Sequence, residues 1–271
     1  MGYNSNLHTH TTYCDGKSTA EDIILRAIAM GYESIGFSGH SYCVGDEDWC
    51  MSREGTVKYR NEVLSLREKY DGKIEVYLGI EQDYFSGKAD FEYDFVIGSV
   101  HKIKKNDTFW SVDESFATAE NAVKNCFLGD WLSYVEEYYA TVKNIVKKTE
   151  CNIIGHFDVV TKFNEGGLYI DETHPRYKNA ALDALETVIG DCNLFEINTG
   201  AIYRRKRSVP YPSEFLLKEI KLRGGEVIIS SDSHNAESLG YKFDEAAELA
   251  KKCGFKYAKM LRCGAFCDVK L

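Results

Sequence analysis

The strongest constraint on the fold is a regular alternation of short apolar runs with longer amphipathic stretches along the 271 residues. Apolar runs of this length predict buried strands, whereas an apolar period of 3.6 residues predicts a helix. Alternation of the two implies a parallel sheet with right-handed crossovers. The predicted strands are Tyr3–Leu7, Ser34–Ser38, Ile74–Ile80, Phe95–Val100, Asn152–Gly155, Leu194–Asn198 and Val227–Ser231.

Helices are predicted between most of these strands. The first begins at a capping box formed by Ser18-Thr19-Ala20-Glu21 and ends at Gly31. No clear helix separates the third and fourth strands, and an apolar segment follows the last helix. The other predicted helices are 57–70, 130–149, 177–189, 213–223 and 243–253.

Polar residues stand at the carboxyl ends of all seven predicted strands. An open, doubly wound sheet would gather a site from two or three strand ends at one switch point. A closed barrel brings every carboxyl end to one mouth. We therefore expect an α/β fold, a distorted (βα)7 TIM-like barrel with the site at the C-terminal ends of the strands. The length is near the ~250 residues of such barrels, and there are three prolines and no linker-like stretch, so residues 1–271 are predicted to form a single domain.

Composition narrows the possible partners and the compartment. A net charge of −9 disfavours general binding of nucleic acid. No apolar run reaches the roughly 18 residues of a membrane span, and the polar start of the chain argues against a secretory signal. The nine cysteines are odd in number and include no Cys-x-x-Cys pair, which favours free thiols in a reducing cytoplasm. We expect a cytoplasmic protein without a nucleic-acid or membrane partner, and nothing in the sequence specifies an oligomeric state.

Six of the seven histidines lie at or just past the end of a predicted strand; His174 follows no strand and is expected at the surface. Imidazoles combined with carboxylates are typical ligands of Zn, Mn or Fe. His8 and His10 are two apart in an extended segment and so point to the same side. The predicted ligands are His8, His10, Glu81 and Asp232 for one ion, Glu81, His101 and His156 for a second, and Asp15, His40 and His234 for a third.

The motifs that carry these residues resemble, in order along the chain, those of the PHP (polymerase and histidinol phosphatase) superfamily. They are His8-Thr9-His10 with Asp15-Gly16, Gly39-His40-Ser41, Gly79-Ile80-Glu81-Gln82-Asp83, Gly98-Ser99-Val100-His101, Gly155-His156-Phe157-Asp158 and Ser231-Asp232-Ser233-His234. The resemblance implies a distorted seven-stranded barrel with three divalent transition-metal ions. Glu196-Ile197-Asn198-Thr199-Gly200-Ala201 resembles the histidinol-phosphatase branch, which hydrolyses L-histidinol phosphate.

The same resemblance implies basic side chains that bind phosphate after the fifth and sixth strands. Lys162 takes the first position in place of an arginine, so a bidentate contact becomes a point charge. After the sixth strand, Tyr203 stands where some members carry arginine, and Arg204, one place later, is the expected clamp. Asn198 either binds the substrate or orders its loop.

The expected chemistry is attack on a small phosphorylated substrate by a metal-bridging hydroxide held where Glu81 and Asp232 meet. The residue that protonates the leaving alkoxide is not identified by the sequence; Asp158 and Asp83 are candidates. Two other functions stay open. One is a PHP phosphodiesterase or nuclease that acts on nucleotides or oligonucleotides, and the other is a non-catalytic, metal-stabilised scaffold.

Overall fold

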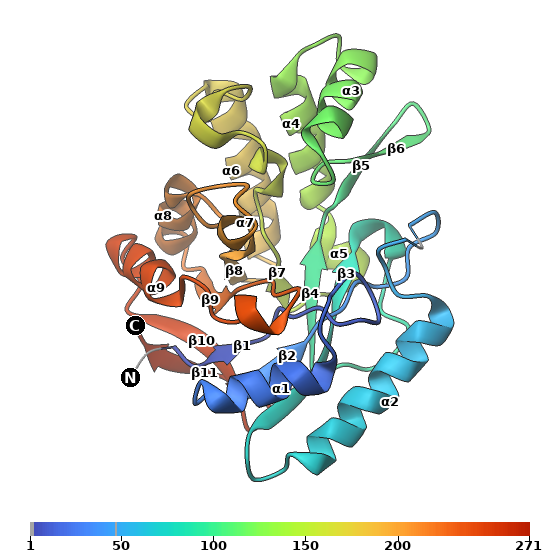
Figure 1. The fold of residues 1–271 in the computed structure, drawn as a ribbon. Coiled ribbons are helices and arrows are strands. Elements are labelled where there is room, and N and C mark those ends of the chain that lie inside the picture. Colours follow the sequence, from blue (N-terminus) through green and yellow to red (C-terminus); the bar gives the residue numbers. More distant parts are fainter. Residues whose placement is uncertain (1–2, 47) are drawn as a thin grey trace.

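The computed structural model describes residues 3–46 and 48–271. At its centre lies a nine-stranded sheet that is parallel except for its last pair, and helices pack against the outer face of this sheet (Figure 1). The strand order is β1-β2-β3-β4-β7-β8-β9-β10-β11. The strands are β1 Ser5–Asn6, β2 Ser34–Phe37, β3 Glu75–Asp83, β4 Phe95–Ser99, β7 Ile153–Ile154, β8 Leu194–Asn198, β9 Glu226–Ser230, β10 Tyr257–Arg262 and β11 Ala265–Lys270.

All seven predicted strands are confirmed, as β1 to β4 and β7 to β9. The helices lie mostly in the connections between them. They are α1 Ala20–Ala29, α2 Arg53–Lys69, α3 Phe116–Cys126, α4 Trp131–Val142, α5 Ile145–Thr149, α6 Pro175–Ile189, α7 Gly200–Tyr203, α8 Glu214–Leu222 and α9 Phe243–Lys252. The α/β class is therefore confirmed, while a barrel of seven β-α units stays a prediction because β10 and β11 extend the sheet.

Three local predictions need correction. The first helix is capped by Thr19 with Asp22, one residue later than predicted. The predicted helix 130–149 is divided into α4 and α5 near Asn144, whose side-chain amide donates to the carbonyl of Ala140 at 3.2 Å and so competes with helical bonding. A two-stranded hairpin, β5 (Lys102–Lys105) with β6 (Thr108–Ser111), and helix α3 were not predicted.

The sheet curls until its first strand meets β9. A parallel bridge joins Thr9 to Ser233, just beyond the ends of β1 and β9. The amide of His10 donates to the carbonyl of Ser233 at 2.8 Å, and the amide of Ser233 donates to the carbonyl of His8 at 3.1 Å. The strand ends at this edge therefore surround one shared space.

Side chains alternate between the two faces of each strand. On the inner face of the curled sheet, apolar side chains fill one end of the enclosed space, called the floor, and polar side chains line the other end, at the carboxyl ends of the strands. On β3, Tyr77 and Gly79 face the same side as Glu81. Phe95 fills the floor next to Gly79, where an added Cβ would lie 2.2 Å from its ring. The buried residues of this inner cluster are Leu7, Tyr77, Phe95, Ile97, Ile153, Leu194, Ile228 and Leu261. A second, larger core lies between the sheet and the helices.

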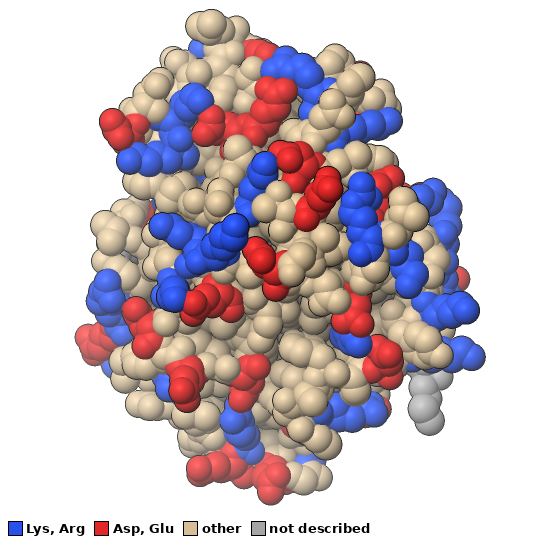
Figure 2. All heavy atoms as spheres, turned by 180° about the vertical axis from the view of Figure 1, so that it is seen from behind, with Lys and Arg blue, Asp and Glu red and all other residues tan. Residues whose placement is uncertain are grey.

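The surface and the helices bear on possible partners. On the face shown in Figure 2, acidic and basic side chains are interspersed, and neither sign covers a continuous large area. Within the described residues, every helix is too short or too polar to cross a bilayer. His174, expected at the surface, is half-buried and caps α6 by accepting the amide proton of Arg176 at 3.1 Å.

Candidate metal centre

The nine predicted metal ligands converge at the carboxyl ends of the strands. His8 Nε2 lies 3.3 Å from Glu81 Oε2, and His10 Nε2 lies 3.2 Å from Asp232 Oδ1. On the outer side, His234 Nε2 lies 3.0 Å from Asp15 Oδ2. Residues from the first and last thirds of the sequence thus meet because the sheet closes between β1 and β9.

In the part of the chain that the structure describes, three groups of side chains bring their ligand atoms within 4.8 Å of one another, which is close enough to share a cation. Their composition overlaps the predicted sets without matching them fully. The structure adds His10 to the predicted third set and groups His40, rather than His156, with Glu81 and His101. The groups are His10 with Asp15, His40 and His234; His8 with His10 and Asp232; and His40 with Glu81 and His101. His156 still lies 3.0 Å from Glu81, between Nε2 and Oε1.

Several buried atoms in this cluster lack any hydrogen-bond partner among the described residues. They include His8 Nε2, His10 Nε2, Glu81 Oε2 and Asp15 Oδ1. Buried polar atoms are nearly always satisfied, so unsatisfied imidazole nitrogens and carboxylate oxygens that face one another require an occupant. Lone pairs on nitrogen and oxygen suit a transition-metal cation, so the residues present fit the predicted ions.

The electrostatics of the cluster keep Glu81 ionised and His10 neutral, whereas, against burial, Glu196 and Glu81 raise the pKa of His8 and Glu81 raises the pKa of His101. Burial alone would raise the pKa of Glu81, but His8, His40 and His101 hold this pKa well below its ordinary value. Burial, together with the neighbouring His234 and His40, lowers the pKa of His10 to about 3. An ionised carboxylate and a neutral imidazole are the forms that coordinate a cation.

Two carboxylates that are not among the predicted metal ligands contact the imidazoles of residues that are. Asp83 Oδ2 lies 3.2 Å from His101 Nδ1, so this candidate acid already has a partner. Glu196 Oε1 lies 2.5 Å from His8 Nδ1, and sequence reasoning gave Glu196 no role. The signal that could have found it is a carboxylate inside the apolar run of β8, since burial of a charge requires strong partners.

The phosphate-clamp candidates differ in their surroundings. Arg204 follows α7 and lies at the site, where Nη2 donates to Asp232 Oδ2 at 2.8 Å and Nη1 lies 3.1 Å from His234 Nδ1. Asn198 is fully buried, and its amide donates to Glu196 Oε2 at 3.0 Å while its carbonyl oxygen accepts from the amide of Gly200 at 2.9 Å. These bonds give Asn198 a role in ordering the loop after β8.

Lys162 is half-buried and pairs with a carboxylate that sequence reasoning missed. Its Nζ donates to Asp113 Oδ2 at 3.1 Å. Burial would raise the pKa of Asp113, but Lys162, followed by His101 and His156, lowers it to about 2. The ammonium group of Lys162 is therefore held close to the cluster by a fixed negative charge.

The other candidate acid, Asp158, is fully buried. Its Oδ2 accepts the amide proton of Ser213 at 2.9 Å, and Oδ1 has no hydrogen-bond partner among the described residues. Burial raises the pKa of Asp158 to about 6, although the nearby Arg207 opposes the shift. This pKa suits proton transfer near neutral pH, whereas Asp83 is occupied by His101.

Trp49 lies against the cluster from a loop after β2. Its ring packs edge-on against His40, with centroids 4.7 Å apart, and lies 5.7 Å from the ring of His101. The edge of an indole against two imidazoles restricts the access of water to their outer side. Trp49 therefore forms part of the wall of the site.

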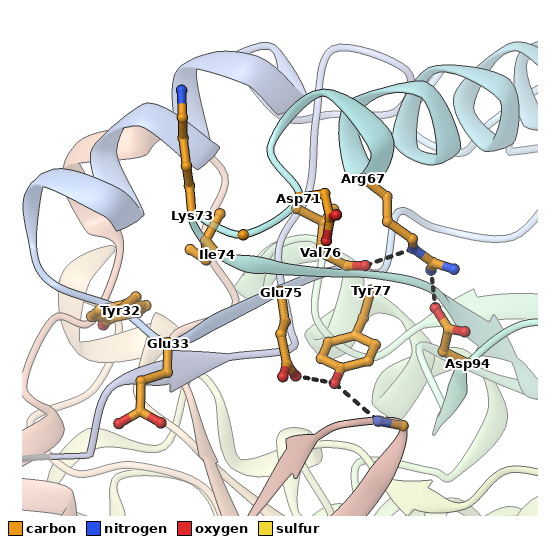
Figure 3. A pocket seen from close by; sticks show the side chains of 12 residues that line it. Tyr32, Glu33, Arg67, Asp71, Lys73, Ile74, Glu75, Val76, Tyr77 and Asp94 are labelled. Atoms are coloured by element: carbon orange, nitrogen blue, oxygen red, sulfur yellow. Dashed lines mark hydrogen bonds and ion pairs between the residues drawn. The ribbon is translucent and has the colours of Figure 1, made fainter.

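A surface pocket of about 670 Å³ lies at the opposite ends of the strands (Figure 3). Several of its polar side chains already have partners: Arg67 pairs with Asp94 and donates to the carbonyl of Val76 at 2.8 Å, and Tyr77 donates to Glu75. None of the potential metal-binding groups among the described residues lies in this pocket. The potential metal-binding groups therefore lie at the carboxyl ends of the strands, away from this pocket.

The fold and the cluster together define a class of protein. The model of the PHP domain family matches residues 6–200 of the chain, which is well over half of its length. The chain therefore belongs to the PHP domain family, as its resemblance in sequence predicted.

Individual relatives extend over nearly the whole chain. The chain is 27% identical to a probable histidinol-phosphatase of Deinococcus radiodurans, over 93% of this chain and 96% of that protein. It is 24% identical to the histidinol-phosphatase of Bacillus subtilis, over 89% and 97%. Among solved structures, the histidinol phosphate phosphatase of Lactococcus lactis, complexed with zinc, L-histidinol and phosphate, superposes with a TM-score of 0.73 at 24% identity, over 97% and 98%. This last likeness shows that the fold is shared.

Proposed function

We propose that the chain is a metal-dependent phosphomonoesterase that hydrolyses L-histidinol phosphate to L-histidinol and phosphate. The observation that carries this function is the convergence of six imidazoles and three carboxylates on one space in a PHP fold. The names of the curated relatives, histidinol-phosphatases that align along almost the entire chain, supply the substrate.

Three divalent ions, Zn, Mn or Fe, are proposed to occupy the cluster. Glu81 would be a ligand of two of them, since its Oε1 faces His101 and His156 while its Oε2 faces His8 and His40. When bound, such ions acidify a water for attack on phosphorus and neutralise charge on the phosphate oxygens. The ligands proposed are His8, His10, Asp15, His40, Glu81, His101, His156, Asp232 and His234.

The residues around the ions orient the phosphate and the alcohol. Arg204 presents a guanidinium beside Asp232, from which it can donate two parallel hydrogen bonds to a phosphate. Lys162 adds a point charge on the side of Asp113. As the bond between phosphorus and the alcohol oxygen breaks, the alkoxide takes up a proton, for which Asp158 and Asp83 stay the candidate donors; Oδ1 of Asp158 has no hydrogen-bond partner among the described residues, whereas Asp83 lies against His101.

The seven parallel strands β1 to β4 and β7 to β9 are proposed to form a distorted (βα)7 barrel, with β10 and β11 as an addition in the same single domain, residues 1–271.

The odd number of cysteines supports the cytoplasm as the compartment.

The function is tested by assaying a panel of phosphomonoesters and phosphodiesters after reconstitution with Mn, Fe or Zn. Strong preference for histidinol phosphate is expected. Equal turnover of many monoesters would contradict histidinol phosphate as the specific substrate. Turnover of oligonucleotide ends would favour a PHP phosphodiesterase. Complete metal loading without any phosphatase activity would indicate a scaffold.

A further inference from the structure

Glu196 lies below the cluster, on β8, and is 1% exposed. Its two oxygens contact four groups, two of which lie on β8 and β9 and two just after β1 and β7. Oε1 lies 2.5 Å from His8 Nδ1 and accepts from the hydroxyl of Ser230, and Oε2 accepts from the backbone amide of His156 at 2.8 Å and from Asn198 Nδ2 at 3.0 Å. All the acceptor positions of the carboxylate are therefore used.

This arrangement determines which nitrogen of His8 carries the proton. A peptide N–H and an amide NH₂ can only donate, so both bonds at Oε2 require an unprotonated acceptor. With the carboxylate ionised, Oε1 can only accept, so its contact with His8 requires a proton on Nδ1, which is the only ring proton in the neutral imidazole that coordinates a cation. The lone pair of Nε2 then faces Glu81 Oε2 at 3.3 Å and Asp232 Oδ1 at 3.7 Å, where Nε2 has no hydrogen-bond partner among the described residues.

The second oxygen of Glu196 acts on another proposed ligand. By accepting the backbone amide of His156, Oε2 fixes the turn that follows β7, and the imidazole of His156 then reaches Glu81 Oε1 at 3.0 Å. One carboxylate thus positions His8, at the first proposed ion, and His156, at the second. Asp83 holds His101 in a comparable way, through Nδ1 at 3.2 Å, but it contacts a single proposed ligand.

We infer that Glu196 is a positioning residue that fixes the tautomer of His8 and the location of His156, so that the affinity for two neighbouring ions depends on it. The inference rests on the proposed metal-dependent function. Carboxylates that orient metal-bound imidazoles typically change metal affinity or activity by 10–100-fold when they are replaced. Glu196→Gln introduces an NH₂ group that cannot accept from the donors on one side of the carboxylate.

The test measures metal-linked stability rather than activity alone. The thermal midpoint of wild type, Glu196→Gln and Asp94→Asn is followed after chelation and across a titration with Zn²⁺ or Mn²⁺. Asp94 is the matched control, since its carboxylate accepts the amide of Leu78 at 2.7 Å at the other end of β3, far from any proposed ligand (Figure 3). A metal stabilises the folded state by an amount that depends on its dissociation constant.

In Glu196→Gln the metal concentration for half-maximal stabilisation is expected to rise by about 10–100-fold, and bound metal measured by mass spectrometry should fall below wild type at limiting supply. Asp94→Asn should lower the midpoints with and without metal equally. If Glu196→Gln instead behaves as Asp94→Asn does, the inference is overturned and Glu196 is a structural carboxylate.

Two further results keep the outcomes distinct. If Glu196→Gln does not fold, Glu196→Asp replaces it, because a side chain one methylene shorter keeps the charge but withdraws it from His8; an unchanged metal requirement in that variant overturns the inference. If wild type binds the ions but does not hydrolyse histidinol phosphate, the proposed function fails while the metal titrations still decide the role of Glu196.

Discussion

At the scale of single residues, Glu81 lies against more imidazoles of the site than any other described carboxylate. Its Oε1 lies 3.0 Å from His156 Nε2 and 3.2 Å from His101 Nε2, and its Oε2 lies 2.8 Å from His40 Nδ1 and 3.3 Å from His8 Nε2. Removal of this carboxylate leaves several imidazoles facing one another without a negative charge between them.

Glu81→Gln is therefore expected to reduce kcat/KM on the order of 10³-fold, since several kcal/mol of charge stabilisation depend on the bridged ions. Bound metal, measured by mass spectrometry, should fall by at least one ion per chain. Glu75→Gln is the control, because it removes a carboxylate from the opposite end of the same strand. Wild-type metal content in Glu81→Gln would contradict the bridging role.

The basic loop after α7 allows a second test with neighbouring residues. Arg204 contacts Asp232, whereas Arg205 is exposed. Arg204→Ala should lower kcat/KM by roughly 10–100-fold, since a hydrogen bond to a charged group contributes about 1.5–3 kcal/mol. Arg205→Ala should retain wild-type kinetics. A large loss of kcat/KM in Arg205→Ala with no loss in Arg204→Ala would show that Arg205, and not Arg204, binds the phosphate.

The sequence predicted the residues that converge on the cluster far better than the residues that support them. A histidine that ends an apolar run is visible in one dimension, and six such histidines reinforce one another. Asp113 and Glu196 act through partners 49 and 188 positions away, on Lys162 and His8. Such pairings depend on how the sheet curls, which local patterns do not encode.

At the scale of elements, the neighbouring strands β3 and β4 pack closely together on the inner face of the curled sheet. Gly79 on β3 faces the ring of Phe95 on β4, and a Cβ at position 79 would lie 2.2–2.6 Å from three atoms of that ring. Phe95 is itself fully buried, so it has no space into which to move.

Gly79→Ala is therefore expected to lower the free energy of unfolding by about 1–3 kcal/mol, the usual cost of overpacking a core. Urea denaturation of the metal-free protein measures this loss. Gly190→Ala is the control, since Gly190 has an ordinary φ of −72° and open space around it, and its stability should stay near wild type. Equal stability of the two variants would show that Phe95 moves aside.

Most of the seven predicted strands were predictable because they are buried and rich in apolar residues. Strands β5, β6, β10 and β11 were missed because their sequences mix polar or charged residues with apolar ones, as Lys102–Lys105 shows. Antiparallel strands with one solvated face carry this weaker pattern. The division of α4 from α5 depended on one side chain, Asn144, which gives no signal in hydrophobic periodicity.

At the scale of the whole molecule, charge pairs make folding depend on pH. The pKa of Asp113 is lowered to about 2 in the folded protein, from an ordinary value of 3.8, against burial and mainly by Lys162. A lowered folded-state pKa gives stability that is present above the ordinary value and is lost as the pH falls through about 4 to about 2.

Asp113→Asn should thus be about 2–3 kcal/mol less stable than wild type near pH 6, since one pKa unit corresponds to about 1.4 kcal/mol. The difference should shrink towards zero near pH 2. Denaturant titrations of the metal-free proteins, so that loss of ions does not contribute, measure the difference. Glu114→Gln, at the exposed neighbouring position, is the control. A constant difference between pH 6 and pH 2 would contradict the assignment.

The closing bridge between Thr9 and Ser233 has a consequence for how the enzyme is made. Nearby, Asn6 and Ser231 bond to each other across 225 positions of the chain, so the two sides of this junction are synthesised far apart in time. His8 and His10 leave the ribosome before Asp232, the carboxylate with which they are proposed to share a cation. A growing polypeptide therefore lacks the complete set of proposed ligands until Asp232 has emerged, and a cation bound there would join the segment after β1 to the segment after β9.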